Sequence, residues 1–150
     1  MARADTERAA PTLLYIMKQV ELAVRSRLDE MFRPLGLTAL QYTALTVLER
    51  HPNLTSAQLA RNSFVTAQSM SDMVTALREQ GLIERRRDPD DGRRLVLTLT
   101  AGGRRLLGRY RGKVAALETE MLSGLTKRQA AELRRSVLAC RAALAERAPH

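Results

Sequence analysis

The chain has little of what several classes of protein require. Among its 150 residues there is one cysteine and no tryptophan, and aromatic side chains make up 3% of the total. A single cysteine cannot form an intramolecular disulfide, which excludes a small secreted scaffold held by disulfides. No apolar run approaches the roughly 20 residues that a membrane-spanning helix needs, and no signal-like apolar segment follows Met1. The sequence therefore predicts a cytoplasmic protein with no membrane partner.

Residues suited to catalysis or metal binding are equally scarce. The two histidines, His51 and His150, have no cysteine, histidine or carboxylate nearby at metal-ligand spacing. Ser69 and Ser71 lack a histidine at a recognisable position, and no glycine-rich phosphate loop follows a strand. The acidic cluster at 88–91 lacks the glutamate that closes an EF-hand loop. We expect no catalytic residue, no metal site, no cofactor and no enzymatic activity.

Size and charge point to one globular domain with an affinity for polyanions. The composition is 45% hydrophobic and 27% charged, which suits a single domain over residues 1–150. The formal net charge is +9, so the surface should attract phosphates, with binding that weakens steeply as salt is added. Solubility alone would also explain such a charge. Nucleic acid is favoured only if the basic residues accompany a DNA-binding motif.

Residues 54–80 predict such a motif, two short helices separated by a tight break. Thr55 and Gln58 form a capping box, which fixes the start of the first helix. Thr66 begins the second helix, and Gly81 follows its end, as glycine usually does. The inward stripe of the second helix is Met70, Met73, Val74 and Leu77.

The opposite face of this second helix is short and polar. Gln68, Asp72 and Thr75 point outward, with Ser69 and Ser71 on the flanks. A helix that reads base edges in the major groove needs hydrogen-bonding groups of this kind. Taken alone, such a face is more often an ordinary solvated surface, so the segment that follows decides the interpretation.

That segment predicts a β-hairpin with a basic tip. Residues 82–87 and 95–99 have strand composition, and in the second run three leucines alternate with Val96 and Thr98. Asp88-Pro89-Asp90-Asp91-Gly92 between them has the chemistry of a turn, and Arg93 and Arg94 follow it. A helix-turn-helix followed by a basic hairpin is a winged helix. The fold class is therefore mainly α with a small β-hairpin wing.

Long helices with narrow apolar seams surround this module. One spans residues 11–35 and ends at Pro34 and Gly36; two more begin at Thr100 and at Thr126, the latter with a capping box to Gln129. Gly102 and Gly103 weaken the first turn after Thr100, which indicates a close approach of two backbones. Cys140 lies on the last seam and is expected to be buried. Candidate seam residues for a dimer interface are Leu13, Met17, Leu107, Tyr110, Val114, Leu117, Leu133 and Val137.

The seams could pack within one chain or against the same helices of a second chain. Periodicity does not decide between these arrangements. Two-fold symmetry is preferred because it sets two recognition helices about 34 Å apart on the duplex.

The wing residues resemble those of MarR-type transcriptional regulators. The matching residues are Gly81-Leu82-Ile83-Glu84-Arg85, Asp88-Pro89, Asp91-Gly92-Arg93 and Leu99-Thr100-Ala101-Gly102-Gly103. Length and helix order match as well, so the resemblance covers nearly the whole chain. It implies a homodimer formed by residues 11–35 and 101–147, and a DNA-binding lobe at 38–100 with its recognition helix at 66–80.

The resemblance also implies roles for individual residues. The arginine at the position of Arg93 would enter the minor groove, braced by Asp91, whereas Asp72 departs from the basic or neutral residue that relatives often carry. Relatives bind small aromatic or phenolic compounds between the dimer helices and the lobe, where this chain has Tyr15, Met31, Phe32 and Tyr42; simple core packing explains these four residues equally well. Redox-sensing relatives carry a cysteine in the first helix, and residues 11–35 contain none. The expected DNA-binding residues are Thr66, Gln68, Ser69, Ser71, Asp72, Thr75, Asp91, Arg93 and Arg94.

These observations predict a homodimeric regulator that binds a pseudo-palindromic operator in double-stranded DNA, usually as a repressor. A small-molecule effector is a candidate second partner. Two other readings stay open: a protein-interaction module whose charge is incidental, and a non-specific architectural DNA-binding protein. Salt-dependent titration with random duplex would separate the first of these from the regulator.

Overall fold

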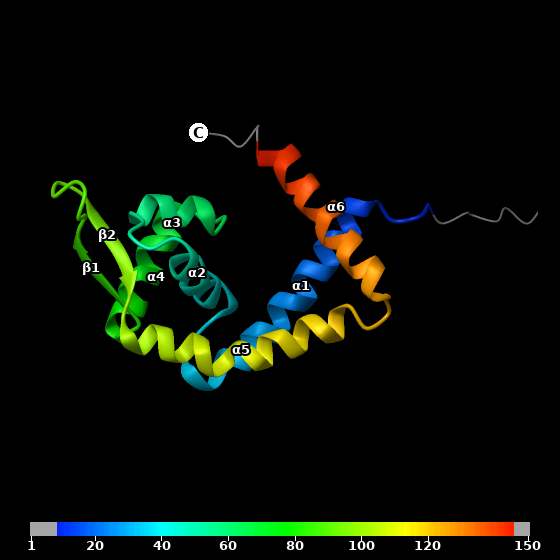
Figure 1. Ribbon diagram of the computed structural model, residues 1–150, viewed down its shortest axis with the longest axis horizontal. Helices are drawn as coiled ribbons and strands as arrows, with labels where there is room; N and C mark the ends of the chain where they lie inside the picture. Colours follow the sequence, from blue (N-terminus) through cyan, green and yellow to red (C-terminus); the bar gives the residue numbers. More distant parts are fainter. Residues whose placement is uncertain (1–8, 146–150) are drawn as a thin grey trace, which may run out of the picture. The chain divides into compact units, whose positions relative to one another are not determined.

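The computed structural model describes residues 9–145 and contains two compact units, and the boundary between them falls inside a helix (Figure 1). The first unit runs to Arg109 and the second begins at Tyr110. The first contains α1 (Leu13–Phe32), the 3-10 turn η1 (Arg33–Leu35), α2 (Ala39–Arg50), α3 (Ser56–Asn62), α4 (Ala67–Glu79), β1 (Ile83–Arg87), β2 (Leu95–Leu99) and the start of α5 (Ala101–Met121). The second contains the rest of α5 and α6 (Lys127–Ala145). His150 and the end of the expected 101–147 segment lie outside the described residues.

Threonines begin the helices, as the sequence predicts for Thr55, Thr66 and Thr126, and Thr38 does the same for α2. Thr38 with Gln41, and Thr55 with Gln58, form reciprocal capping boxes at the starts of α2 and α3. The hydroxyl of Thr126 accepts from the Gln129 amide at 3.1 Å, and the Gln129 side chain accepts from the Thr126 amide at 2.9 Å. Each box satisfies two backbone donors that would otherwise lack a partner at the helix terminus.

The first long helix ends earlier than expected. The α-helix stops at Phe32 rather than continuing to residue 35, and η1 follows with Pro34 near its start. Proline has no amide hydrogen and its ring collides with the carbonyl four residues earlier, which explains the change. Gly36 then adopts the left-handed conformation, with φ 69°, and turns the chain toward α2.

The core of the first unit is a winged helix-turn-helix, so the predicted fold class is confirmed. Helix α3 packs against α4, and α2 packs against β2, around fully buried Leu45, Leu59, Met70, Leu77 and Leu97. Strands β1 and β2 pair antiparallel, with Ile83 opposite Leu99 and Arg87 opposite Leu95. The compact unit is larger than the 38–100 lobe, because α1 and the first turns of α5 belong to it.

Strand β2 forms as predicted, but burial does not alternate along it. Leu95 is exposed, whereas the residues from Val96 to Leu99 are all buried, Thr98 included. The free edge of β2 is covered because the Leu97 amide donates to the Leu54 carbonyl at 2.7 Å, which forms an isolated bridge. Elements distant in sequence therefore cover both faces, and a pattern within one strand cannot reveal that.

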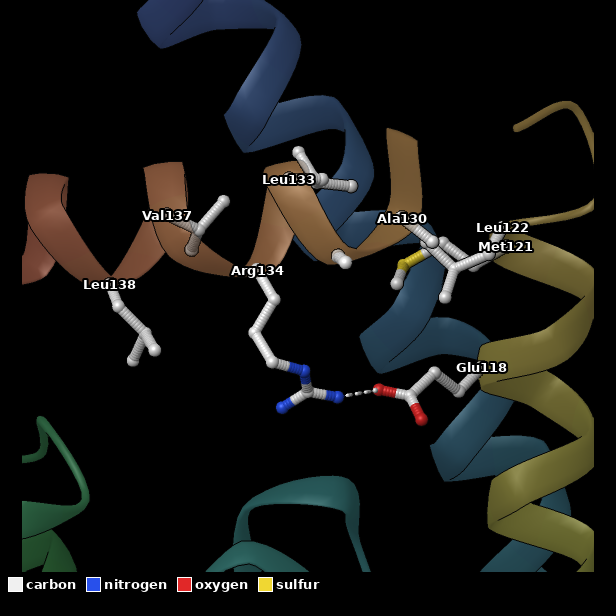
Figure 2. A pocket seen from close by; sticks show the side chains of 9 residues that line it. Glu118, Met121, Leu122, Ala130, Leu133, Arg134, Val137 and Leu138 are labelled. Atoms are coloured by element: carbon white, nitrogen blue, oxygen red, sulfur yellow. Dashed lines mark hydrogen bonds and ion pairs between the residues drawn. The ribbon is translucent and has the colours of Figure 1, made fainter. Parts of the chain in front are cut away.

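The second unit is a helical pair whose apolar residues are largely exposed. Within the described part of α6 no residue is buried, and Cys140 is exposed, so its expected burial is wrong for the single chain. Side chains of Met121, Leu122, Leu133, Val137 and Leu138 line a groove of about 350 Å³ between the two helices (Figure 2). Arg134 and Glu118 pair at its edge at 3.4 Å. The seam on α6 exists as predicted, but nothing in its own unit covers it.

No helix in the described chain is both long enough and apolar enough to span a membrane.

Candidate nucleic-acid interface

Helix α4 has one buried face and, opposite it, an exposed polar face, here called its front. The hydroxyl of Thr66 caps it by accepting from the Ser69 amide at 3.1 Å. Met70, Val74 and Leu77 are buried against the core. The residues expected to contact DNA are all exposed on the helix: Gln68, Ser69, Ser71, Asp72 and Thr75. Thr66 is exposed as well, beside the helix N-terminus, where partial positive charge favours a phosphate.

Two local hydrogen bonds shape this front. The Gln68 amide nitrogen donates to Asp72 Oδ1 at 3.4 Å, one helical turn away. Because a carboxylate only accepts, this contact turns the Gln68 carbonyl oxygen away from Asp72. The Thr75 hydroxyl donates to the Ser71 carbonyl at 3.1 Å, so its proton is used within the helix. Gln68 and Thr75 are therefore both oriented by a residue one turn away on the same helix.

The turn that precedes α4 contains a residue that sequence reasoning missed. Phe64 follows Ser63, the C-cap of α3, and has φ 56°, in the left-handed region. Its side chain is 89% exposed. An aromatic residue in a turn two positions before a threonine cap was the available signal.

The wing turn is built by its own aspartates. Asp88 Oδ1 accepts from the Asp90 amide at 3.0 Å, and Asp91 Oδ1 accepts from the Arg93 amide at 3.1 Å. The Asp91 carbonyl also accepts from the Arg94 amide at 3.0 Å, and the Asp88 amide donates to the Arg94 carbonyl at 2.9 Å. The acidic cluster thus satisfies backbone donors in a tight turn.

Asp91 braces the backbone of Arg93 rather than its guanidinium. No residue of the described chain pairs with the side chain of Arg93 or Arg94, and both are exposed. By contrast, Arg87 donates to the Gly92 carbonyl at 2.8 Å, and Arg86 donates to Asn53 Oδ1 at 3.3 Å. Arg86 and Arg87 are therefore tethered, whereas Arg93 and Arg94, which follow the turn, present their charge to solvent.

The base of the wing is locked to α4 and α5. The Thr100 hydroxyl donates to the Gly81 carbonyl at 2.6 Å and accepts from the Gly103 amide at 3.1 Å. The Thr100 amide donates to the Leu82 carbonyl at 3.1 Å. A Cβ on Gly103 would overlap the Leu82 carbonyl oxygen, so the close backbone approach predicted at Gly102 and Gly103 is present. Helix α4 and the wing therefore lie in one compact unit, with the hairpin extending from the end of α4 (Figure 1).

The four candidate pocket residues do not gather at one place in the chain. Phe32 and Tyr42 stack with their ring centroids 4.5 Å apart, and Phe32 is fully buried. Tyr15 is 56% exposed near the other end of α1. It lies 16 residues from Met31, about 24 Å along a helix that rises about 1.5 Å per residue.

The candidate dimer residues differ in exposure. Leu13, Met17, Leu133 and Val137 are exposed, and Tyr110, Val114 and Leu117 are half-buried. Leu107 is 4% exposed and belongs to the core of the first unit. It therefore has almost no surface to offer a partner.

Comparison with known proteins agrees with this geometry. The model of the MarR family matches residues 35–94. The HTH-type transcriptional repressor Rv2887 of Mycobacterium tuberculosis is 36% identical over 121 residues, covering 81% of this chain and 87% of the relative.

Two solved structures are also similar. The transcriptional repressor CouR, bound to a 23-mer DNA duplex, is 30% identical with a TM-score of 0.72, covering 87% of this chain and 92% of CouR. The complex of M. tuberculosis Rv2887 with salicylic acid is 33% identical with a TM-score of 0.71, covering 88% of this chain and 98% of that one.

Proposed function

The chain belongs to the MarR family of winged helix-turn-helix transcriptional regulators, and from this premise we propose that it is a repressor that binds a pseudo-palindromic operator as a homodimer. The observation that carries the proposal is the pairing of two surfaces in one unit. The same compact unit presents an exposed polar face on α4 and a hairpin tip whose Arg93 and Arg94 face solvent.

Helix α4 would read the major groove. Its N-terminal residues contact base edges in this mode of docking, and Thr66 would stand next to a phosphate. Gln68, with its amide nitrogen held by Asp72, would present its carbonyl oxygen to a base amino group of adenine or cytosine. Asp72 would thus act partly by orienting Gln68, which gives a physical reason for an acid on this face. Ser69, Ser71 and Thr75 would complete the contact surface.

The wing would supply charge in the minor groove and along the phosphates. Arg93 has a fixed backbone, because Asp91 accepts from its amide, and a side chain that is free to enter the groove. Arg94 would bind the adjacent phosphates. Neutralising phosphates releases counterions, so the logarithm of the association constant should fall linearly with the logarithm of the salt concentration.

Dimerisation would cover the exposed seams. Leu13 and Met17 on α1, and Leu133 and Val137 on α6, are large apolar side chains exposed in the single chain. The groove between α5 and α6 has apolar walls that a helix of a second copy could fill (Figure 2). Two reading heads related by two-fold symmetry would then require two half-sites one helical turn apart.

A small aromatic acid is the proposed effector class, by analogy with the salicylic acid complex of Rv2887. Phe32 and Tyr42 already stack on each other, so they would form a wall rather than open a cavity. Tyr15 lies too far along α1 to join Met31 in one chain. A shared site would therefore need Tyr15 of the partner subunit.

The proposal is tested by selecting duplexes from a random pool and measuring their affinity by fluorescence anisotropy across a salt series. The selected duplex should bind far more tightly than a scrambled one, with a steep salt slope. Arg93→Ala should weaken binding to both duplexes and lower the slope by about 1 to 2 per dimer, whereas Gln68→Ala should change the selected sequence. Arg128→Ala is the control, because it removes an exposed positive charge on α6, outside the proposed interface. Equal affinity for all sequences would contradict the proposal.

A further inference from the structure

Phe64 is the one large aromatic side chain in the described chain that lies almost wholly in water. The sequence contains two phenylalanines; Phe32 is fully buried, whereas Phe64 is 89% exposed. It stands in the turn between α3 and α4, two residues before the cap Thr66. Packing within the chain therefore does not explain why the residue is aromatic.

The backbone makes the choice of phenylalanine more unusual. The Phe64 amide donates to the Arg61 carbonyl at 3.4 Å, and the Val65 amide donates to the Ala60 carbonyl at 3.1 Å. This pair of bonds defines a Schellman motif, in which the left-handed residue is usually glycine.

The same chain follows that rule at two other helix ends. Gly36 and Gly81 occupy the equivalent positions, with φ 69° and 71°, and the same two bonds recur there. Phe64 adopts φ 56° although a Cβ disfavours this region. A strained, exposed residue that gives no packing in return points to a contact outside the chain.

The position of the turn indicates what that contact is. When a helix-turn-helix docks, the second helix enters the major groove by its N-terminal end and the first crosses the backbone. A side chain in the turn between them then lies at the edge of the groove. Thymine is the base that presents a methyl group there, and phenylalanine is a suitable apolar partner for it.

We propose that Phe64 reads a thymine in each operator half-site by packing its ring on the 5-methyl group. This inference rests on the proposed DNA-binding function, and it adds a specificity residue to those on α4 and the wing. Gln68 supplies hydrogen-bond readout, and Phe64 supplies apolar readout next to it.

The test replaces each thymine of a selected duplex, one pair of symmetric positions at a time, with deoxyuridine, which lacks only the methyl group. Wild-type protein should lose about fourfold in affinity per methyl at one such pair, as expected for one buried methyl-sized group. Phe64→Gly should bind the thymine and deoxyuridine duplexes equally. Phe64→Tyr keeps the ring and should retain the wild-type preference.

Folding and assembly are checked on the same variants. Phe64→Gly should melt no lower than wild type, because glycine accepts the left-handed backbone, and should keep the wild-type mass in solution. The proposal is overturned if Phe64→Gly retains the loss at the deoxyuridine pair, or if wild type is indifferent to every substitution. A Phe64→Gly variant that changes oligomeric state would assign the ring to a protein contact instead. If wild type binds no duplex at all, the DNA-binding function fails together with this inference, which separates the two results.

Discussion

Replacing Gly103 with alanine should destabilise the protein because α5 approaches the base of the wing without room for a side chain. The new Cβ would overlap the Leu82 carbonyl oxygen and lie 3.2 Å from both the Leu82 carbonyl carbon and Leu99 Cδ2. Relief requires α5 to move away from the hairpin. That movement stretches the 3.1 Å bond from the Thr100 amide to the Leu82 carbonyl.

The size of the effect follows from these contacts. Overpacking costs about 1–3 kcal/mol, and one weakened hydrogen bond adds about 1 kcal/mol. The higher helix propensity of alanine relative to glycine offsets up to about 1 kcal/mol of this destabilisation. A net loss of about 1–3 kcal/mol is expected, which lowers the melting temperature by roughly 2–12 °C at this chain length.

Gly108→Ala is the matched control for this experiment. Gly108 lies on the same helix, and an added Cβ there meets nothing within 4 Å. It should raise stability by up to about 1 kcal/mol through helix propensity alone. Thermal unfolding followed by circular dichroism compares the two variants with wild type. If Gly103→Ala melts at or above the temperature of Gly108→Ala, the close docking of α5 on the wing base is refuted.

Two further variants test the core and the seams. Thr98 is 6% exposed, and its hydroxyl has no hydrogen-bond partner among the described residues. Thr98→Val should therefore raise the free energy of unfolding, measured by denaturant titration, by about 1 kcal/mol. A lower free energy of unfolding would indicate that the hydroxyl is hydrogen-bonded. Val137→Glu places a charge in the exposed apolar groove. In sedimentation velocity it should convert the proposed dimer to monomers while leaving helicity unchanged, whereas Arg128→Glu on the same helix should not.

Local chemistry made much of the fold predictable. Thr38, Thr55 and Thr126 are each followed three residues later by a glutamine. The capping boxes that these pairs form act within a single turn of helix. Gly81 and the Asp91 turn are equally local. For that reason the helix starts, the wing and the exposed front of α4 follow from the sequence.

Features that depend on distant elements could not be predicted in this way. The burial of Thr98 depends on Leu54 closing the edge of β2 and on cover from other elements. The exposure of Cys140 arises because its seam has no partner in its own unit. Phe64 escaped notice because an aromatic residue in a turn has no periodic pattern, and only its backbone conformation and exposure distinguish it.

Native mass spectrometry of the protein mixed with its selected duplex tests the central claim most directly. The proposed function requires two protomers on one duplex, each reading one half-site with α4 and the wing. The expected spectrum is dominated by a complex of two chains and one duplex, and Arg93→Ala should reduce its abundance. A single chain on the duplex, or free duplex at protein concentrations well above that of the operator, would contradict the claim.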